Sequence, residues 1–413
     1  MTTPEPLRAT PPSLLVVATV GGTLGGFLTP YAEHFRRLGW RVDAAAAGAT
    51  DDPRVTAAFD DVHDLPISRS MRDVGGLVRG AAAVRALVDR PYDIVHVHTP
   101  IASFMTRSVV RRLAADRRPR VVYTAHGFHF RAGGRALANA AFLTAERVAG
   151  RWTDRLVVIN AEDEQAARRH RIVPERRLVR MPGIGLDTDR YAPGVVAETD
   201  VADARERLGV GVDTPLFTIV GELNVNKRQA DAIRALAVLR PTGAHLALAG
   251  DGPSRAALEE MVRALGLEDR VHLLGGIPDV RPLVRASTAV LLTSTREGLA
   301  RSVMEALSLE VPVVASTARG NRELVGDDAG IVFETGDIDQ LVSAMRWMLD
   351  HPVERRAMGL RGRERMVARY DLRILIRLHE QLYGSLLAER GRATRAGVPT
   401  DPRDPSGDSA ASG

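Results

Sequence analysis

The stretch AVLLTSTREGLARSVMEALSLEVPVVA, residues 289–315, contains the pattern that decides the fold of this chain. Residues 289–292 are a short apolar run, and residues 311–315 are another. Between them lies a polar loop with a glycine, followed by a segment with helical spacing around Glu305. A strand, a helix and a second strand in this order predict a βαβ unit in a parallel sheet that is covered on both faces.

The same alternation recurs along the chain. In the first half, strands are expected at Leu14–Val20, Val42–Ala46, Ile94–His98, Val121–Thr124 and Leu156–Ile159. In the second half, they are expected at Leu216–Val220, Leu246–Ala249, Val271–Leu274, Ala289–Leu292, Val311–Ala315 and Ile331–Phe333. Because helical patterns separate these runs, the predicted fold class is α/β, with two doubly wound, Rossmann-like domains.

Breaks in this alternation predict the domain boundaries. The first domain is expected over residues 13–182 and the second over 215–370, with the turn-rich segment 183–214 as the linker. A long amphipathic helix is expected over 371–390, packing back toward the first domain. The two ends of the chain are predicted to be a flexible N-terminus and a disordered tail: 1–12 and 391–413.

The composition excludes several classes of protein. Of the 413 residues, 45% are hydrophobic and 26% are charged, which is typical of a globular protein and not of collagen or a coiled coil. The chain has no cysteine, so it has no disulfide scaffold and no thiolate metal site. It shows neither a secretory signal nor an apolar run of the roughly 18–20 residues that span a bilayer, and a cytoplasmic location is expected.

The charge is unevenly distributed. Residues 1–190 contain 28 arginines and 20 acidic residues, a net charge of +8, so the total of +5 leaves −3 for the rest. Lys227 is the only lysine in the sequence. A composition this poor in lysine keeps one most easily where a compact ammonium performs a task that arginine does not.

In an open α/β sheet, ligands bind beyond the carboxyl ends of the strands. The loop 21–26 follows the first strand, and its glycines, Gly22 and Gly25 among them, either present backbone N–H groups to an anion or form a tight turn. His98 and His126 end two neighbouring strands. They either donate to a substrate oxygen or satisfy local backbone groups, and their shared position favours the first interpretation.

The loops of the second half are more explicit. The sequence GELNVNKR, residues 221–228, leads into a helix and places Lys227 where an ammonium can meet a diphosphate. Glu297 lies in a glycine-containing loop, and Glu305 lies in the helix that follows. Carboxylates accept hydrogen bonds from sugar diols, although a capping glutamate and a solvated glutamate are the structural alternative. We interpret the 187–189 motif, Asp-Thr-Asp, as structural, and no metal site is expected.

These motifs together resemble the retaining GT-B glycosyltransferases of family 4. The resemblance covers residues 13–385 and is carried by the E-x7-E signature from Glu297 to Glu305, by residues 250–253 and 276–280, and by the two histidine loops. The histidine loops, HVHTP at 96–100 and TAHGF at 124–128, are similar to those of the branch that makes capsules and lipid-linked oligosaccharides. The resemblance implies a GT-B fold, with the two domains facing a central cleft.

The resemblance also implies roles for single residues. Glu305 is expected to bind the ribose, Glu297 and His126 the transferred sugar, and Lys227 the leaving diphosphate. Further donor contacts are implied for the amides of Gly298, Leu299 and Ala300, for Ile277 and Pro278 near the base, and for Gly22. The first domain is expected to receive the acceptor, with Gly25 and His98 on that side.

The implied reaction is transfer of a sugar from a nucleotide sugar, expected to be a UDP-sugar, with retention of configuration. The acceptor is a polyprenyl-diphosphate-linked sugar or another glycan. No metal, no other cofactor and no nucleic-acid partner is expected. Many family members have arginine where this chain has Glu222, so Lys227 must carry more of the charge, or Arg228 must help.

Two other classes remain open at this stage. A nucleotide-sugar epimerase shares the two-domain architecture and needs no acceptor. A catalytically silent partner subunit would keep the fold and bind the donor weakly. A pyridoxal-phosphate phosphorylase is disfavoured, because its cofactor needs a lysine and the only one lies in the loop 221–228.

A basic surface is expected over residues 101–120. This segment contains six arginines and one acidic residue, Asp116, with apolar residues on one helical face that can pack while the arginines extend outward. Either it is simply a solvated basic face, or it docks on an anionic membrane. The arginines assigned to such docking are Arg107, Arg111, Arg112, Arg117 and Arg118.

Overall fold

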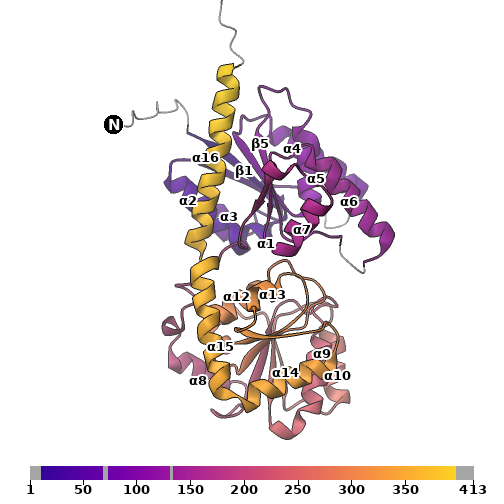
Figure 1. Ribbon diagram of the computed structural model, residues 1–413, viewed down its shortest axis with the longest axis vertical. Helices are drawn as coiled ribbons and strands as arrows, with labels where there is room; N and C mark the ends of the chain where they lie inside the picture. The colour runs from indigo at the N-terminus through magenta and orange to yellow at the C-terminus, as the bar shows by residue number, and fades with distance from the viewer. Residues whose placement is uncertain (1–10, 68–72, 131–133, 397–413) are drawn as a thin grey trace, which may run out of the picture.

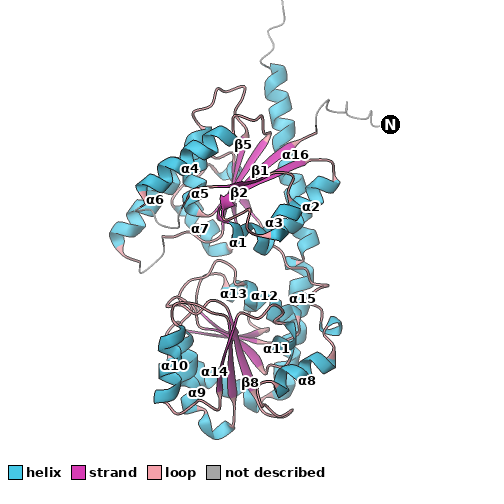
Figure 2. Ribbon diagram, turned by 180° about the vertical axis from the view of Figure 1, so that it is seen from behind, coloured by secondary structure: helices cyan, strands magenta, loops and turns pink. Residues whose placement is uncertain are grey.

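The computed structural model describes residues 11–67, 73–130 and 134–396, and it consists of two α/β domains placed end to end (Figure 1). Each domain is built on one parallel sheet with helices on both faces (Figure 2). The expected flexible N-terminus lies outside the described residues, except for its last two positions. Residues 397–413 of the expected tail also lie outside them.

The N-terminal sheet has seven parallel strands in the order β3-β2-β1-β4-β5-β6-β7. The strands are β1 (Ser13–Val20), β2 (Arg41–Ala47), β3 (Val62–Asp64), β4 (Ile94–His98), β5 (Arg120–Ala125), β6 (Arg155–Val158) and β7 (Leu178–Arg180). Along β1, Leu15 and Val17 enter one core cluster, whereas Leu14 and Val16 enter the other. Alternate side chains of a strand point to opposite faces, so a sheet covered on both sides needs the continuous apolar runs seen in the sequence.

The helices of this domain form the two covering layers. One core cluster contains residues of α4 (Val74–Leu87), α5 (Pro100–Val110) and α7 (Ala161–Arg169), and it is joined by α6 (Ala136–Gly150). The other contains residues of α2 (Thr29–Arg37) and α3 (Pro53–Ala58). The short α1 (Gly21–Thr23) and a π-helical turn, Leu24–Leu28, connect β1 to α2.

The C-terminal sheet has six parallel strands in the order β10-β9-β8-β11-β12-β13. The strands are β8 (Leu216–Val220), β9 (His245–Ala249), β10 (Val271–Gly275), β11 (Ala289–Leu292), β12 (Val313–Ser316) and β13 (Gly330–Phe333). The helices are α8 (Glu198–Glu206), α9 (Gln229–Val238), α10 (Arg255–Ala264), α11 (Arg281–Arg285), α12 (Arg301–Ser308), α13 (Asn321–Val325), α14 (Ile338–Asp350) and α15 (Pro352–Arg365). α9, α10 and α14 share one core cluster, and α12 and α13 share another.

The last helix, α16 (Leu372–Ala396), returns to the N-terminal domain (Figure 1). Its residues Leu375, Leu382, Tyr383 and Leu386 are buried in the same cluster as α2 and α3. The chain crosses between the domains twice, and the two crossings are joined where Leu186 bonds the backbone of residues 370 and 372. The C-terminal end of the sequence therefore completes the core of the N-terminal domain.

Four expectations about strands, helices and the linker differ from the structure. The short strands β3 and β7 were missed, because their residues are only partly buried at the two edges of the sheet. The segment 183–214 is not all linker, since it contains α8, which packs on α11. Residues 391–396 are helical rather than part of a disordered tail, because α16 continues through them. The helical pattern over residues 102–115 predicts a helix to Ala115, but α5 ends at Val110, five residues earlier.

The assignment of Arg107 to a membrane surface was wrong. Its side chain is buried, lies 4.2 Å over the ring of Tyr123, and bonds Glu146 at 3.3 Å and Thr153 at 3.2 Å. α5 lies between the sheet and α6, so both sides of the helix pack and an arginine on the inner side needs a buried partner. Arg111, Arg112, Arg117 and Arg118 are exposed.

Candidate active site between the two domains

The loops at the carboxyl ends of the two sheets meet between the domains. The loop after β5 contains His126 and Gly127, and the loop after β11 contains Glu297 and Gly298. A Cβ atom added to Gly298 would lie 1.9 Å from the carbonyl oxygen of His126, and one added to Gly127 would lie 3.4 Å from the Cα of Gly298. Glycine at position 298 therefore allows a backbone contact that any other residue would block.

Polar contacts support this meeting of the domains. Arg319, after β12, donates to Asp163 at 2.6 Å and to the carbonyl oxygens of Phe128 and Phe130 at 3.0 and 3.1 Å. Asn160 donates to the carbonyl oxygen of Gly298 at 3.3 Å. These bonds hold the histidine loop of one domain against the glutamate loop of the other.

Lys227 and Glu297 form an ion pair, with 2.8 Å between Nζ and Oε1. Their side chains are 19% and 13% exposed. The two loops that carry them are joined by hydrogen bonds from Thr293 to the Lys227 carbonyl oxygen at 2.6 Å and from Thr295 N–H to Asn226 at 2.8 Å. The ammonium thus has a fixed position at the loop that precedes α12.

Gly221 explains how the lysine side chain reaches that position. A Cβ atom at Gly221 would lie 3.4 Å from Cε of Lys227, so the stem of the lysine runs over this glycine. The φ angle of Gly221 is 150°, a conformation that favours glycine. A larger residue here would strain the backbone and crowd the lysine.

Glu222 and Arg228, the two other charged residues of this loop, make local contacts. Glu222 is exposed and accepts a bond from Asn224 at 3.0 Å. Arg228, with φ of 50°, donates to Asp231 at 2.6 Å in the first turn of α9. The structure therefore pairs Arg228 with Asp231 and leaves Lys227 as the residue of this loop that faces Glu297.

Glu305, the second glutamate of the E-x7-E motif, lies in α12 and is 7% exposed. Its Oε1 accepts from the hydroxyl of Tyr191 at 2.8 Å and from Nε of Arg301 at 2.8 Å. Arg301 also donates to the carbonyl oxygen of Gly26 in the N-terminal domain. Leu299 and Ala300, just before α12, are buried, and no side chain within the described residues caps the start of this helix.

Four histidines form a group at the histidine loop, of which His96, His98 and His379 are buried and His126 is partly buried. His126 and His98 hydrogen-bond at 3.0 Å between Nε2 and Nδ1, and the rings of His98 and His96 lie 4.2 Å apart. The rings of His96 and His379, which lies on α16, are 5.8 Å apart. His96 bonds both Thr124 at 2.7 Å and Tyr383 at 2.6 Å. This group connects the active-site end of the sheet to α16.

Burial keeps these imidazoles neutral. It lowers the pKa of His126 to about 4 and that of His379 to about 4. The pKa values of His96 and His98 lie well below the usual value, chiefly because of burial and secondarily because of the neighbouring imidazoles. A neutral His126 keeps one ring nitrogen as a donor and the other as an acceptor.

Two glycines after β1, Gly22 and Gly25, differ in their surroundings. Gly22 is exposed, and a Cβ atom there would meet nothing within 4 Å. Gly25 is buried, and a Cβ atom there would lie 2.3 Å from Asp52 Oδ2. Gly22 is therefore open to a ligand, whereas Gly25 packs against the start of α3.

The expected base-binding residues follow β10. Ile277 is partly buried and packs against the cluster that contains Leu283 of α11, and Pro278 is exposed. The expected structural role of the 187–189 motif agrees with its contacts, because Thr188 bonds Asp371 and Asp189 pairs with Arg373 at 3.0 Å. Asp187 accepts a hydrogen bond from the N–H of Arg190 at 2.9 Å.

Sequence reasoning missed the partners of the expected residues. Tyr191 and Arg301 hold Glu305, but Tyr191 is 114 positions away and carries no motif. His96 lies in the HVHTP motif, which predicts no role for it, and its partners Tyr383 and His379 come from the last helix. Only the spacing of Arg301 and Glu305, four residues apart on one helix, could have indicated its pair from sequence.

Known proteins share this architecture. A family model described as Glycosyl transferase 4-like domain matches residues 23–183, and one described as Glycosyl transferases group 1 matches residues 200–365. The solved structure of HepE from Anabaena, in complex with UDP, superposes with a TM-score of 0.74 at 19% identity, covering 90% of this chain and 100% of HepE. That likeness shows the fold.

Curated relatives extend the match over both domains. The glycosyltransferase candidate EpsD of Bacillus subtilis is 31% identical over 354 residues, which are 85% of this chain and 91% of EpsD. A UDP-Gal:α-D-GlcNAc-diphosphoundecaprenol α-1,3-galactosyltransferase of Escherichia coli is 29% identical over 277 residues, 65% of this chain and 69% of that enzyme. With one family model on each sheet and a relative aligned over most of both chains, the chain belongs to the GT-B glycosyltransferases of family 4 and is an enzyme of that class.

Proposed function

We propose that the enzyme transfers a sugar from a UDP-sugar, with retention of configuration, to a polyprenyl-diphosphate-linked sugar or another glycan. The observation that carries the proposal is the Lys227–Glu297 pair, held at the loop before α12 and facing the His126 loop. The structure of HepE in complex with UDP and the relative named UDP-Gal:α-D-GlcNAc-diphosphoundecaprenol α-1,3-galactosyltransferase support a UDP donor and a lipid-linked acceptor.

In this proposal the diphosphate leaves the sugar with the electron pair of the glycosidic bond. Its negative charge grows as the bond breaks, so a fixed ammonium stabilises the transition state more than the bound donor. Lys227 supplies that charge, and the start of α12 adds the positive end of a helix dipole. The new bond forms between the anomeric carbon and an acceptor hydroxyl oxygen, whose proton passes to the leaving diphosphate.

Glu297 and His126 are proposed to hold the transferred sugar. Glu297 already accepts from Lys227 through Oε1, so a hydroxyl of the sugar would bond its other oxygen. His126 approaches from the opposite domain and is neutral, which suits a donor to a sugar oxygen. A donor held between these loops would keep both domains together.

Glu305 is proposed to bind the ribose. Both of its bonds to Tyr191 and Arg301 fall on Oε1, so Oε2 is the atom assigned to the ribose hydroxyls. The buried position makes these bonds stronger than they would be in water. Gly22, Ile277, Pro278 and the amides of residues 298–300 are proposed as the remaining donor contacts.

We propose that the reaction needs no metal ion and no other cofactor, since Lys227 supplies the charge that an ion would supply. Within the described residues, Asp43, Asp61 and His63 lie close enough to share an ion. They lie on and beside β2 and β3, and Arg41 pairs with both aspartates, at 3.1 and 2.7 Å. Guanidinium groups already neutralise this cluster.

The acceptor is proposed to approach from the N-terminal domain. We propose that this domain docks on the anionic cytoplasmic face of the plasma membrane. Within the described residues, no helix is both long and apolar enough to cross a bilayer. The arginines that remain for docking are exposed ones: Arg111, Arg112, Arg117 and Arg118. Each well-placed arginine contributes up to about 1 kcal/mol to binding of an anionic surface, and salt screens it.

Radiolabelled UDP-sugars incubated with the purified enzyme, with and without a bacterial lipid extract, test the proposal. Label that moves to the organic phase only when lipid is present supports a lipid-linked acceptor. Conversion of the nucleotide sugar without any acceptor would instead indicate an epimerase. No turnover of any UDP-sugar would overturn the assignment of the donor, and strong stimulation by magnesium would overturn the metal-independent mechanism.

A further inference from the structure

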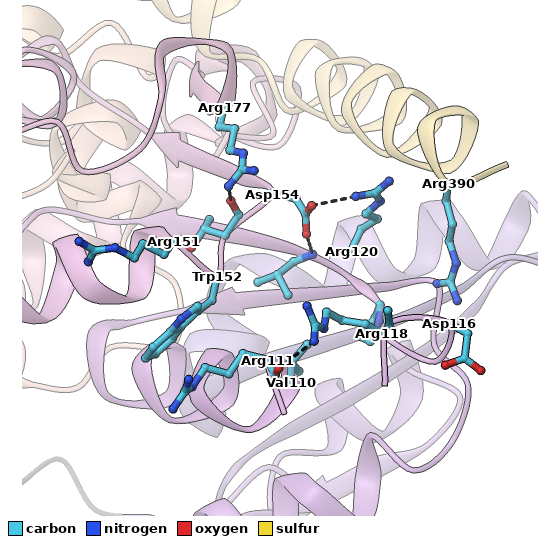
Figure 3. Close-up of a pocket in the computed structure, with 14 residues that line it drawn as sticks. Val110, Arg111, Asp116, Arg118, Arg120, Arg151, Trp152, Asp154, Arg177 and Arg390 are labelled. Atoms are coloured by element: carbon cyan, nitrogen blue, oxygen red, sulfur yellow. Dashed lines mark hydrogen bonds and ion pairs between the residues drawn. The ribbon is translucent and has the colours of Figure 1, made fainter. Parts of the chain in front are cut away.

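A second site is indicated at the opposite end of the N-terminal sheet, where β5 and β6 begin. A cavity of about 590 Å³ lies there, between the end of α5, the start of β5 and the last turns of α16 (Figure 3). β5 runs six residues from Arg120 to the histidine loop, a length of about 17–20 Å at roughly 3.3 Å per residue. The cavity is therefore separated from the proposed donor site by the length of the sheet.

The cavity is strongly basic. Its lining includes two aspartates and six arginines: Arg111, Arg118, Arg120, Arg151, Arg177 and Arg390. Asp154 is already used, because its two oxygens accept from Arg120 at 3.0 Å and from the Val121 N–H at 2.8 Å. Arg390 lies 3.8 Å from Asp93. Asp116 is thus the remaining acidic residue of the lining.

The other four arginines are held in place without being neutralised. Arg118 donates to the carbonyl oxygens of residues 111 and 113, both at 2.9 Å, and Arg177 donates to that of residue 153 at 3.2 Å. Arg151 donates to the carbonyl oxygen of residue 147 at 3.3 Å, and Arg111 lies 4.5 Å over the ring of Trp152. Among the described residues, no carboxylate lies within 4.0 Å of these four guanidinium groups.

A second hollow adjoins the first and shares Arg151 and Arg177 with it. Its volume is about 600 Å³, and it adds Arg147 and Arg171 to the lining. No aspartate or glutamate of the described chain lines it. The two hollows therefore form one concave basic face, which we call the arginine hollow.

We propose that the arginine hollow binds a multiply charged phosphate group, carried either by a lipid headgroup or by a soluble diphosphate. Guanidinium groups match phosphate oxygens through paired N–H donors, and here backbone bonds and the Trp152 ring restrict their orientation before a ligand arrives. The site takes no part in the proposed sugar transfer. It shares Arg111 and Arg118 with the proposed membrane surface, and adds a defined pocket to it.

Trp152 gives a direct readout. The chain has three tryptophans, so W40F/W347F leaves Trp152 in the wall of the cavity as the reporter. Titration with inorganic pyrophosphate is expected to change its fluorescence with saturation. Adding R151Q/R177Q should weaken that binding by about tenfold or more, since two charge-assisted contacts are lost. R37Q/R79Q, which removes two exposed arginines elsewhere in the same domain, should leave it unchanged.

A second titration distinguishes a lipid headgroup from a soluble diphosphate as the source of the phosphate. Phosphatidylcholine vesicles with and without phosphatidic acid replace pyrophosphate in the same titration. A response to both probes, or to one only, identifies which source the site accepts, provided that R151Q/R177Q weakens it. R118Q/R390Q serves as a second test if the first pair folds poorly by circular dichroism.

The proposal is overturned if neither probe changes the Trp152 signal, or if the arginine variants respond like R37Q/R79Q. K227A is expected to keep the full response, because Lys227 lies in the C-terminal domain beside Glu297, away from the arginine hollow of the N-terminal domain. A failed transferase assay with an intact Trp152 response would therefore count against the proposed reaction and not against this site.

Discussion

At the scale of single residues, one lysine in 413 residues is placed beside the glutamate that begins the E-x7-E motif. Arginine supplies every other basic charge apart from the histidines, so the presence of lysine at this one position calls for a physical reason. The ammonium is a compact charge on a thin stem, and that stem passes over Gly221 with its Cε only 3.4 Å from a built Cβ.

Lys227→Ala is expected to lower kcat by about 10²–10³, because a preorganised charge is lost from the transition state. Binding of UDP, measured by calorimetry, should weaken less than kcat falls. Lys227→Arg is the matched control, and we expect it to recover only part of the rate, since the planar guanidinium does not fit the same position. A Lys227→Ala rate within about threefold of the wild type would remove this residue from the mechanism.

Glu305→Ala is expected to weaken UDP binding by about 1.5–3 kcal/mol, the value of charge-assisted hydrogen bonds to a ribose. Calorimetry measures it directly. The control is Tyr191→Phe, which removes one hydrogen bond to Glu305 and leaves the carboxylate present. If Tyr191→Phe weakens UDP binding as much as Glu305→Ala does, the effect is structural and the ribose assignment is wrong.

At the scale of elements, α16 belongs to the end of the sequence and to the core of the first domain. Leu375 is fully buried in the cluster of α2 and α3, and Tyr383 bonds His96 on β4 at 2.6 Å. The helix therefore ties the C-terminal half of the chain to β4, the strand that ends at His98. The expected stability of the N-terminal sheet depends on residues almost three hundred positions away.

Leu375→Ala is expected to destabilise the protein by about 2–5 kcal/mol, because it leaves a cavity in a packed core. Urea unfolding followed by circular dichroism measures the change. Leu360→Ala, at a half-exposed site on α15, is the control and should cost far less. Equal losses in the two variants would show that α16 is not part of the N-terminal core in solution.

At the scale of the whole molecule, the group of His96, His98, His126 and His379 makes stability depend on pH. Their folded-state pKa values, about 4 for His126 and His379, lie below the ordinary value near 6.5. Between these two pH values the unfolded chain binds more protons than the folded one, so stability is lost as the pH falls from 6.5 toward 4. Above pH 6.5 these histidines no longer contribute to the slope.

We therefore expect the melting temperature to fall steeply between pH 6.5 and pH 4. His379→Leu should reduce this slope, because a side chain of similar bulk without a titrating group replaces a buried imidazole. His34→Gln, at a partly exposed site paired with Glu380, is the comparison variant and should keep most of it. Identical slopes in His379→Leu and the wild type would contradict the buried-histidine explanation.

The fold could be predicted from sequence to a large extent, and the family resemblance is confirmed by the models that match both halves. Eleven apolar runs were located because strands buried on both faces need continuous apolar residues. The apolar pattern does not predict β3 and β7, because an edge strand pairs with one strand only and needs fewer apolar residues. The segment 183–214 resembles a linker in sequence because its charged α8 has no buried residue of its own.

The candidate site divides in the same way between sequence and tertiary structure. Local sequence determined which loops follow strands, because strand ends are set by local pattern. It therefore placed His126, Lys227 and Glu297 beyond the carboxyl ends of strands. Only the tertiary structure decided that Arg107 is buried, that Arg228 pairs with Asp231, and that Glu305 is held by Tyr191. Those outcomes depend on which elements pack together. Tyr191 and Glu305 lie 114 residues apart, and no periodic pattern in the sequence indicates that two such distant side chains form a hydrogen bond.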